Sequence, residues 1–185
     1  MKFIYAILLL TLLSFTQSDK ANLIPWSKDY KLQWADFTGK PAGSLKALTS
    51  SSINFETKKA DAGGITLLIN TYFIKDKSWR QKDFTDDFVL QHEQTHFDIT
   101  EVYARKLRKK LSEAKYTDIK KAMPEIQKTY NEIFSESRAY QKKYDEETNH
   151  SINKDVQIKW NKKVADELQS LNAYTNPEVN MVIKK

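Results

Sequence analysis

The spacing of hydrophobic residues divides the chain into a strand-rich first part and a helical second part. Residues 65–74 (ITLLINTYFI) form a nearly continuous apolar run, which predicts a strand covered on both faces. Alternating apolar residues in the segment 30–37 (YKLQWADF) predict an earlier strand, and residues 53–55 predict another. The sequence Asp-Ala-Gly-Gly at 61–64 is typical of a hairpin turn between two of them. These elements together predict a small antiparallel sheet.

From Phe84 onward the apolar residues recur with the period of a helix. A first stripe, in steps of three and four residues, comprises Phe88, His92, His96, Ile99, Tyr103 and Leu107. A second stripe runs from Ile119 to Tyr144, and we expect its main helix to begin at Pro124, since proline suits the first helical turn. A third helix is predicted around residues 156–168, with Trp160 in the core. The pattern predicts an α+β domain in which His92 and His96 lie on an inward helix face.

The N-terminus has the features of a secretory signal peptide. Lys2 supplies a positive charge, and residues 3–15 form an apolar run of 13 residues, too short to span a bilayer of about 30 Å as a helix. We place cleavage between Thr16 and Asp19, so residues 1–18 are the predicted signal peptide and residues 19–185 the domain. An uncleaved membrane anchor is the alternative. The prediction is a protein that is exported, to the periplasm or beyond, with no stable membrane insertion after cleavage.

Composition narrows the classes of function. The chain contains no cysteine, which excludes disulfides, thiolate metal ligands and a cysteine nucleophile. The net charge is +6, and basic residues are densest between residues 105 and 115. Since these cations fall toward the end of a predicted helix, we expect them to form a solvated face that complements the helix dipole. No nucleic-acid partner is predicted.

Residues 92–96 read His-Glu-Gln-Thr-His, an H-E-x-x-H sequence on the first predicted helix. A spacing of four places His92 and His96 on the same face, where their neutral nitrogens can bind one Zn²⁺ at about 2.0–2.1 Å. Glu93 projects beside the metal and is the candidate general base, which takes a proton from a zinc-bound water and returns it to a leaving amine. The alternative is a pair of buried core histidines with a surface glutamate.

A catalytic zinc site needs a third protein ligand and an open position for water. From His96 to a predicted turn near Lys115 is 19 residues, or about 28 Å of helix. An antiparallel return of equal length reaches the level of the histidines at about residues 135–150. The candidate ligands in that window are Glu136, Asp145, Glu146, Glu147 and His150. Glu101 is sterically less suited because it leaves the same helix too far along, and geometry alone does not choose among the others.

Three segments resemble DUF922, a bacterial family of predicted secreted zinc-dependent proteases. They are LQWADFTG (32–39), HEQTHFDITEVYARKL (92–107) and YDEETNHS (144–151), the last followed by Gln157 and Trp160. The family pattern Y-D-x-x-T-x-H-G is matched except at Ser151, where glycine is usual. The resemblance implies a zincin-like fold with His150 as the third ligand. In that case His150→Ala weakens zinc binding nearly as much as His96→Ala, and Glu136→Ala or Asp145→Ala much less.

Two further residues near this segment have open roles. Tyr144 could donate a hydrogen bond to an oxyanion opposite the metal, or it could be a core aromatic residue that closes the second stripe. Asp145, if it is not a ligand, could hold a ligand imidazole from behind.

The expectation is therefore an exported zinc metallopeptidase with one catalytic Zn²⁺, bound by His92, His96 and His150, and with Glu93 as general base. Its partner is a peptide or protein substrate, which the strand at residues 65–74 could align by backbone pairing. The alternatives are an exported non-catalytic module that binds zinc or a partner protein, and a cell-wall peptide amidase with the same residues. Glu93 favours an enzyme, because a structural site has no need of a general base.

Overall fold

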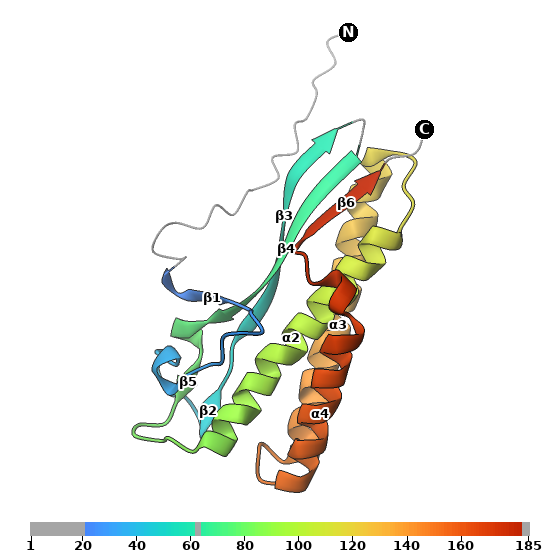
Figure 1. The fold of residues 1–185 in the computed structure, drawn as a ribbon. Coiled ribbons are helices and arrows are strands. Elements are labelled where there is room, and N and C mark those ends of the chain that lie inside the picture. The colour runs from blue at the N-terminus through green and yellow to red at the C-terminus, as the bar shows by residue number, and fades with distance from the viewer. Residues whose placement is uncertain (1–20, 62–63, 183–185) are drawn as a thin grey trace.

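The computed structural model describes residues 21–61 and 64–182, and it consists of an antiparallel sheet with three helices packed against it (Figure 1). In the main sheet β4 pairs with β3 along one edge and with β1 and β6 along the other. A second, two-stranded sheet consists of β2 and β5. The strands are β1 (Leu23–Pro25), β2 (Ala47–Leu48), β3 (Ser51–Asp61), β4 (Gly64–Ile74), β5 (Trp79–Arg80) and β6 (Glu178–Val182). The predicted α+β class and antiparallel sheet are confirmed.

The long helix α2 (Asp87–Glu113) lies between the sheet and the other two helices (Figure 1). Helix α3 (Ile119–Thr148) runs back along it, and α4 (Lys154–Ser170) packs beside both. Short 3-10 helices occur at Trp34–Asp36 (η1), Lys75–Lys77 (η2) and Asn172–Tyr174 (η3). This order of layers places one face of α2 on the sheet and another against α3, where the two histidines lie.

The main core forms between β4 and the three helices. Its fully buried side chains include Ile65, Leu67 and Ile69 of β4, Ile99, Val102 and Leu107 of α2, and Ile126, Ile133 and Tyr144 of α3. Side chains of β4 alternate between buried and half-buried along the strand. The prediction that both faces of this strand are covered is therefore confirmed for one face only, because the helices lie on that face and the residues of the other face are half-buried (Figure 1).

Residues 30–37 do not form the predicted strand. The buried Asp36 side chain accepts hydrogen bonds from Gln33 N (2.8 Å) and Tyr30 Oη (2.7 Å), and this closes the chain into the 3-10 helix η1. Leu32 nevertheless enters a small second core, with Phe37, Phe73 and Phe97. Of the alternating apolar residues only Leu32 is buried, and Tyr30 is 38% exposed. The strand does not form because the Asp36 carboxylate competes locally for the backbone N–H groups.

Helix α3 begins at Ile119, five residues before the predicted start at Pro124. Asp118 caps it by accepting a hydrogen bond from Lys120 N (2.8 Å), and Ala122 and Ile126 are buried in the core. Pro124 therefore lies inside the helix, at the cost of one backbone hydrogen bond. The predicted turn near Lys115 is confirmed, since α2 ends at Glu113 and α3 starts at Ile119.

The basic stretch on α2 is only partly the solvated face that was expected. Arg105 and Arg108 are buried, and both bind the buried Glu101 carboxylate, with N–O distances of 2.9 Å. Arg108 also donates to the Ile69 carbonyl of β4 (2.9 Å). These two arginines are paired and enclosed within the fold, so they provide no surface for an external polyanion.

Two sequence predictions fall outside the described residues. The signal peptide at 1–18 and its cleavage site lie there, and so do Ala62 and Gly63 of the predicted hairpin turn. The hairpin itself is confirmed by the antiparallel pairing of β3 with β4, which ends at Asp61↔Gly64. Among the helices of residues 21–61 and 64–182, none is sufficiently long and apolar to cross a membrane.

Candidate metal centre

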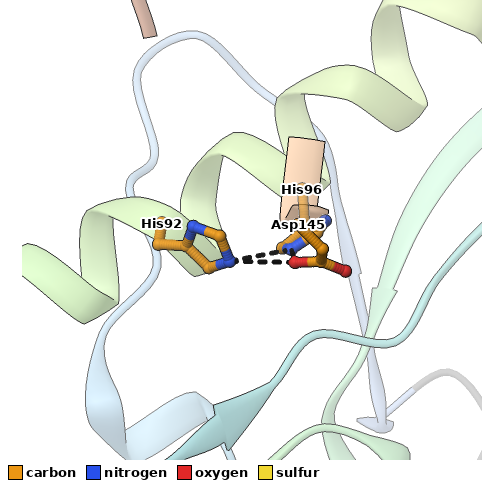
Figure 2. A group of neighbouring side chains, drawn as sticks. All are labelled: His92, His96 and Asp145. Carbon is orange, nitrogen blue, oxygen red and sulfur yellow. Dashed lines mark hydrogen bonds and ion pairs between the residues drawn. The ribbon is translucent and has the colours of Figure 1, made fainter. Parts of the chain in front are cut away.

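Helices α2 and α3 bring two histidines and one carboxylate together. His92 and His96 lie one turn apart on α2, and Asp145 lies near the end of α3 (Figure 2). The Nε2 atoms of the two histidines are 3.1 Å apart, and Asp145 Oδ1 is 3.2 Å from His92 Nε2 and 2.9 Å from His96 Nε2. Three potential ligand atoms from two helices therefore point at one another.

The other ring nitrogens are held by glutamine amides. His92 Nδ1 is 3.2 Å from Gln157 Oε1, and His96 Nδ1 is 2.5 Å from Gln141 Oε1. Both amide nitrogens donate to main-chain carbonyls, that of Gln157 to Phe88 O (3.0 Å) and that of Gln141 to His96 O (2.9 Å). The amide oxygens must therefore accept, so the Nδ1 atoms carry the protons and each Nε2 presents a lone pair. Outer partners of this kind orient metal-binding histidines.

Two imidazole lone pairs and a carboxylate oxygen converge with no donor of their own between them. Such an arrangement is repulsive unless a cation, either a proton or a metal ion, lies among the three atoms. Ligand atoms bound at 2.0–2.1 Å in a tetrahedron stand about 3.3 Å apart, close to the separations observed here. His92, His96 and Asp145 could therefore hold one metal ion.

The electrostatics indicate where a proton sits when no metal is bound. Burial lowers the pKa of His96, but hydrogen bonding and the charge of Asp145 outweigh burial and raise it above its ordinary value. For His92 burial dominates, and its pKa falls below the ordinary value. Burial raises the pKa of the Asp145 carboxyl, but the two imidazoles lower it by more, so that group stays ionised. Without a metal ion a proton in this group is therefore favoured on His96 over His92, beside the ionised Asp145.

Glu93 lies beside this group without joining it. Its side chain is buried and lines the same cleft as His92 and His96, yet its Oε2 atom has no hydrogen-bond partner in the described part of the chain. The charge of Glu93 is close enough to favour the protonated forms of His92 and His96. A buried carboxylate oxygen without a hydrogen-bond donor is energetically costly, which sets Glu93 apart from the paired carboxylates of the fold.

Of the other candidate ligands, the three glutamates lie away from the group. Glu136 is exposed and lies 3.7 Å from Lys110 Nζ, while Glu146 pairs with Lys142 at 3.4 Å. Glu147 accepts a hydrogen bond from Trp160 Nε1 (2.7 Å). Glu101 is bound by the two buried arginines.

His150 lies next to the group, at the edge of the cleft. Its Nδ1 atom is 3.5 Å from Asp145 Oδ1, and its side chain is 52% exposed. The structure thus brings Asp145 into contact with both histidines of α2 and leaves His150 in contact with Asp145. The assignment of His150 as a ligand stays a prediction.

Tyr144 and Trp160 both belong to the core. The Tyr144 ring stacks on His92 with centroids 4.5 Å apart, and its side chain is fully buried. Trp160 packs against it at 5.4 Å. Since Tyr144 does not line the cleft, the structure supports its interpretation as a core aromatic residue that supports the imidazoles.

His92, His96 and Asp145, which we call the metal group, line a cleft of about 360 Å³ between α3 and the start of β3. Strand β4 does not reach this cleft, and both of its edges are already paired, so the prediction that residues 65–74 align a substrate is wrong. Strand β3 pairs only with β4 in the described part of the chain, and Ser51, Ser52 and Ile53 line the cleft. The outer edge of β3 is thus the strand edge beside the metal group.

The turn that follows α3 has an unusual backbone. Asn149, His150 and Ser151 have φ angles of 47°, 50° and 73°, all in the left-handed region that favours glycine. Glycine adopts this conformation without strain, which agrees with the glycine that the family resemblance implies at Ser151. The departure at Ser151 costs conformational energy and leaves the metal group intact.

We expect Ser151→Gly to raise the free energy of unfolding by about 0.5–1 kcal/mol, because a left-handed residue other than glycine costs about 1–2 kcal/mol, partly offset by the entropy of glycine. Denaturant unfolding of the purified protein measures this. Ser151→Ala is the matched control, since alanine keeps the strain and gives no gain. Equal stabilities for the glycine and alanine variants contradict the explanation.

Residues 75–151 match the sequence model of a family described as bacterial protein of unknown function (DUF922). The matched segment contains His92, Glu93, His96, Asp145 and His150, whereas the LQWADFTG segment, Gln157 and Trp160 lie outside it. The match confirms the family resemblance, and the description of the family states no activity. No curated protein and no solved structure matches the chain.

Proposed function

We propose that this protein, whose residues 75–151 match the DUF922 family model, is an exported zinc-dependent peptidase of the zincin type. The observation that carries the proposal is the convergence of His92 Nε2, His96 Nε2 and Asp145 Oδ1 within 2.9–3.2 Å, next to a buried carboxylate oxygen of Glu93 that has no partner. A structural zinc site is closed by four protein ligands. Here an open cleft lies over the group, which favours a catalytic site.

In this proposal His92, His96 and Asp145 hold the ion, and Gln157 and Gln141 fix the orientation of the two imidazoles. A zinc ion bound there supplies Lewis-acid polarisation of a carbonyl and lowers the pKa of water. Glu93 accepts a proton from the attacking water and delivers it to the leaving amine. Its lack of a hydrogen-bond partner suits this task, because no donor in the protein must be released first.

The outer edge of β3 is suited to hold an extended peptide. Ser50 O accepts from Ile74 N of β4 (2.8 Å), whereas Ile53 O accepts from Tyr130 Oη of α3 (3.0 Å). Because successive residues of a strand point their backbone groups to opposite edges, those of Ser51 point to the cleft side, as Ile53 does. A peptide can pair with this edge beside the metal group.

Two measurements test the proposal. Elemental analysis of the purified protein is expected to find about one zinc per chain. Incubation with a broad peptide pool, followed by mass spectrometry, is expected to show cleavage that a zinc chelator abolishes. Stoichiometric zinc without any cleavage indicates the non-catalytic module, and cleavage confined to cell-wall peptides indicates the amidase.

Zinc binding is expected to release about one proton at about pH 5.5, one unit below the ordinary pKa of histidine. The pKa of His96 is raised by Asp145, so His96 is protonated at this pH when the metal is absent, and zinc requires the neutral ring. The zinc association constant therefore falls about tenfold per pH unit below that pKa and levels off above it. Calorimetry in buffers of different ionisation enthalpy counts the protons.

The variant Asp145→Asn is the control for this measurement. It removes the charge that raises the pKa of His96, so the number of protons released at the same pH falls. Zinc binding by the parent protein with no proton release would contradict the assignment.

A further inference from the structure

The charged side chains that line the cleft carry a net positive charge when a divalent cation is bound. Four charged side chains line the cleft, the acidic Glu93 and Asp145 and the basic Lys46 and Arg138. A divalent cation at the metal group balances both carboxylates. The cleft then keeps two positive charges, so it favours a ligand that carries negative charge.

Of the two basic residues of the cleft, Arg138 has no partner in the described part of the chain. On the same helix, Lys142 and Lys143 pair with Glu146 and Glu147 at 3.4 and 3.7 Å. Lys46 lies over the ring of Phe84, 6.0 Å from its centroid. Arg138 has neither an ion pair nor a hydrogen bond within residues 21–61 and 64–182. Arginine presents a planar fork of donors that matches a carboxylate.

The cleft also has an apolar part. Leu45 and Phe134 line it and are 36% and 43% exposed, although both are large hydrophobic residues, and Phe134 lies one helical turn before Arg138 on α3. Phe134 stacks on Tyr130, whose hydroxyl binds Ile53 O of β3 (3.0 Å), so these contacts join α3 to β3 at that end. A ligand on this side therefore combines an apolar group with a negative one.

The spacing between Arg138 and Asp145 along α3 gives the approximate distance from Arg138 to the peptide bond that the proposed peptidase cuts. Arg138 precedes Asp145 by seven residues, or about 10 Å of helix. An extended peptide advances about 3.3 Å per residue, so this distance equals about three residues. We infer that Arg138 binds a carboxylate of the peptide substrate, about three residues from the bond that is cut. The inference rests on the proposed function and makes Arg138 a specificity-determining residue.

The carboxylate can come from an Asp or Glu side chain or from a free C-terminus. Three pentapeptides of one apolar sequence, labelled with a neutral coumarin dye, separate these sources. The first has a free C-terminus, the second an amidated C-terminus and one Glu, and the third an amidated C-terminus and Gln in place of Glu. Their affinities are measured by fluorescence anisotropy on the zinc-loaded Glu93→Gln protein, so that binding is read without turnover.

At least one peptide with a carboxylate is expected to bind about 10-fold more tightly than the third peptide, because a partly exposed charge-assisted hydrogen bond is worth about one such factor. Adding Arg138→Gln removes the preference, and adding Lys142→Gln, on the outer side of the same helix, preserves it. Equal affinities for all three peptides, no binding of any, or a preference that survives Arg138→Gln overturns the inference. Failure of the peptidase proposal is separate, because it appears as absence of Glu93-dependent cleavage by the parent protein.

Discussion

Glu93→Gln is expected to lower the rate of peptide hydrolysis by a factor on the order of 10² or more while zinc remains bound. The substitution keeps the size of the side chain and removes its ability to accept and return a proton. Since Glu93 provides none of the three converging ligand atoms, the zinc content should stay near one per chain. Hydrolysis rates and elemental analysis on the same preparations measure both quantities.

The matched control is Glu132→Gln, which changes an exposed glutamate of α3 that faces Lys128. It should cleave at the parental rate. If Glu93→Gln also cleaves at that rate, Glu93 is not the general base. If Glu93→Gln loses both its hydrolytic activity and its zinc, Glu93 acts through metal binding and the proposed mechanism is wrong.

Asp145→Asn is expected to weaken zinc binding by more than about 100-fold, the upper limit for loss of a group that only orients a ligand. The reason is that Asp145 Oδ1 contacts both imidazoles and supplies the negative charge of the group. The double variant His92→Ala, His96→Ala should bind no zinc at this site. Competition titration with a zinc chelator ranks the variants.

Glu146→Gln is the control beside it, because Glu146 is exposed and pairs only with Lys142 in the described residues. His150→Ala should fall between these variants, within a 10–100-fold loss, since His150 contacts Asp145 from the edge of the cleft. A severe defect in His150→Ala together with a mild one in Asp145→Asn reverses the assignment and supports His150 as the third ligand.

The sequence was most informative where one helix or one strand sufficed. The spacing of His92 and His96 placed both imidazoles on one face of α2, and helix lengths placed residues 135–150 opposite them. Helix length determines the level along an axis, but not the rotation of α3 about that axis. For that reason helix length alone does not separate Asp145 from the other candidates in the window, Glu136, Glu146, Glu147 and His150.

Other features depended on contacts between distant segments. The amides of Gln141 and Gln157 orient the histidines from two further helices, and the only signal for Gln141 was its place four residues before Asp145. The sequence predicts a solvated basic face where Arg105 and Arg108 are in fact buried and paired with Glu101. The density of charges in a sequence does not show which cations have partners. The outer edge of β3 is the edge that we propose for substrate binding because β1 and β6 occupy the second edge of β4, and these pairings join distant segments.

The identity of the ligands can be observed in crystals of the zinc-loaded protein. Anomalous diffraction data collected on both sides of the zinc absorption edge locate the metal without reference to sequence or mechanism. We expect one peak, about 2.0–2.2 Å from His92 Nε2, His96 Nε2 and an oxygen of Asp145. A peak that His150 contacts in place of Asp145 contradicts the ligand set, and fully loaded crystals with no zinc between His92 and His96 contradict the metal centre itself.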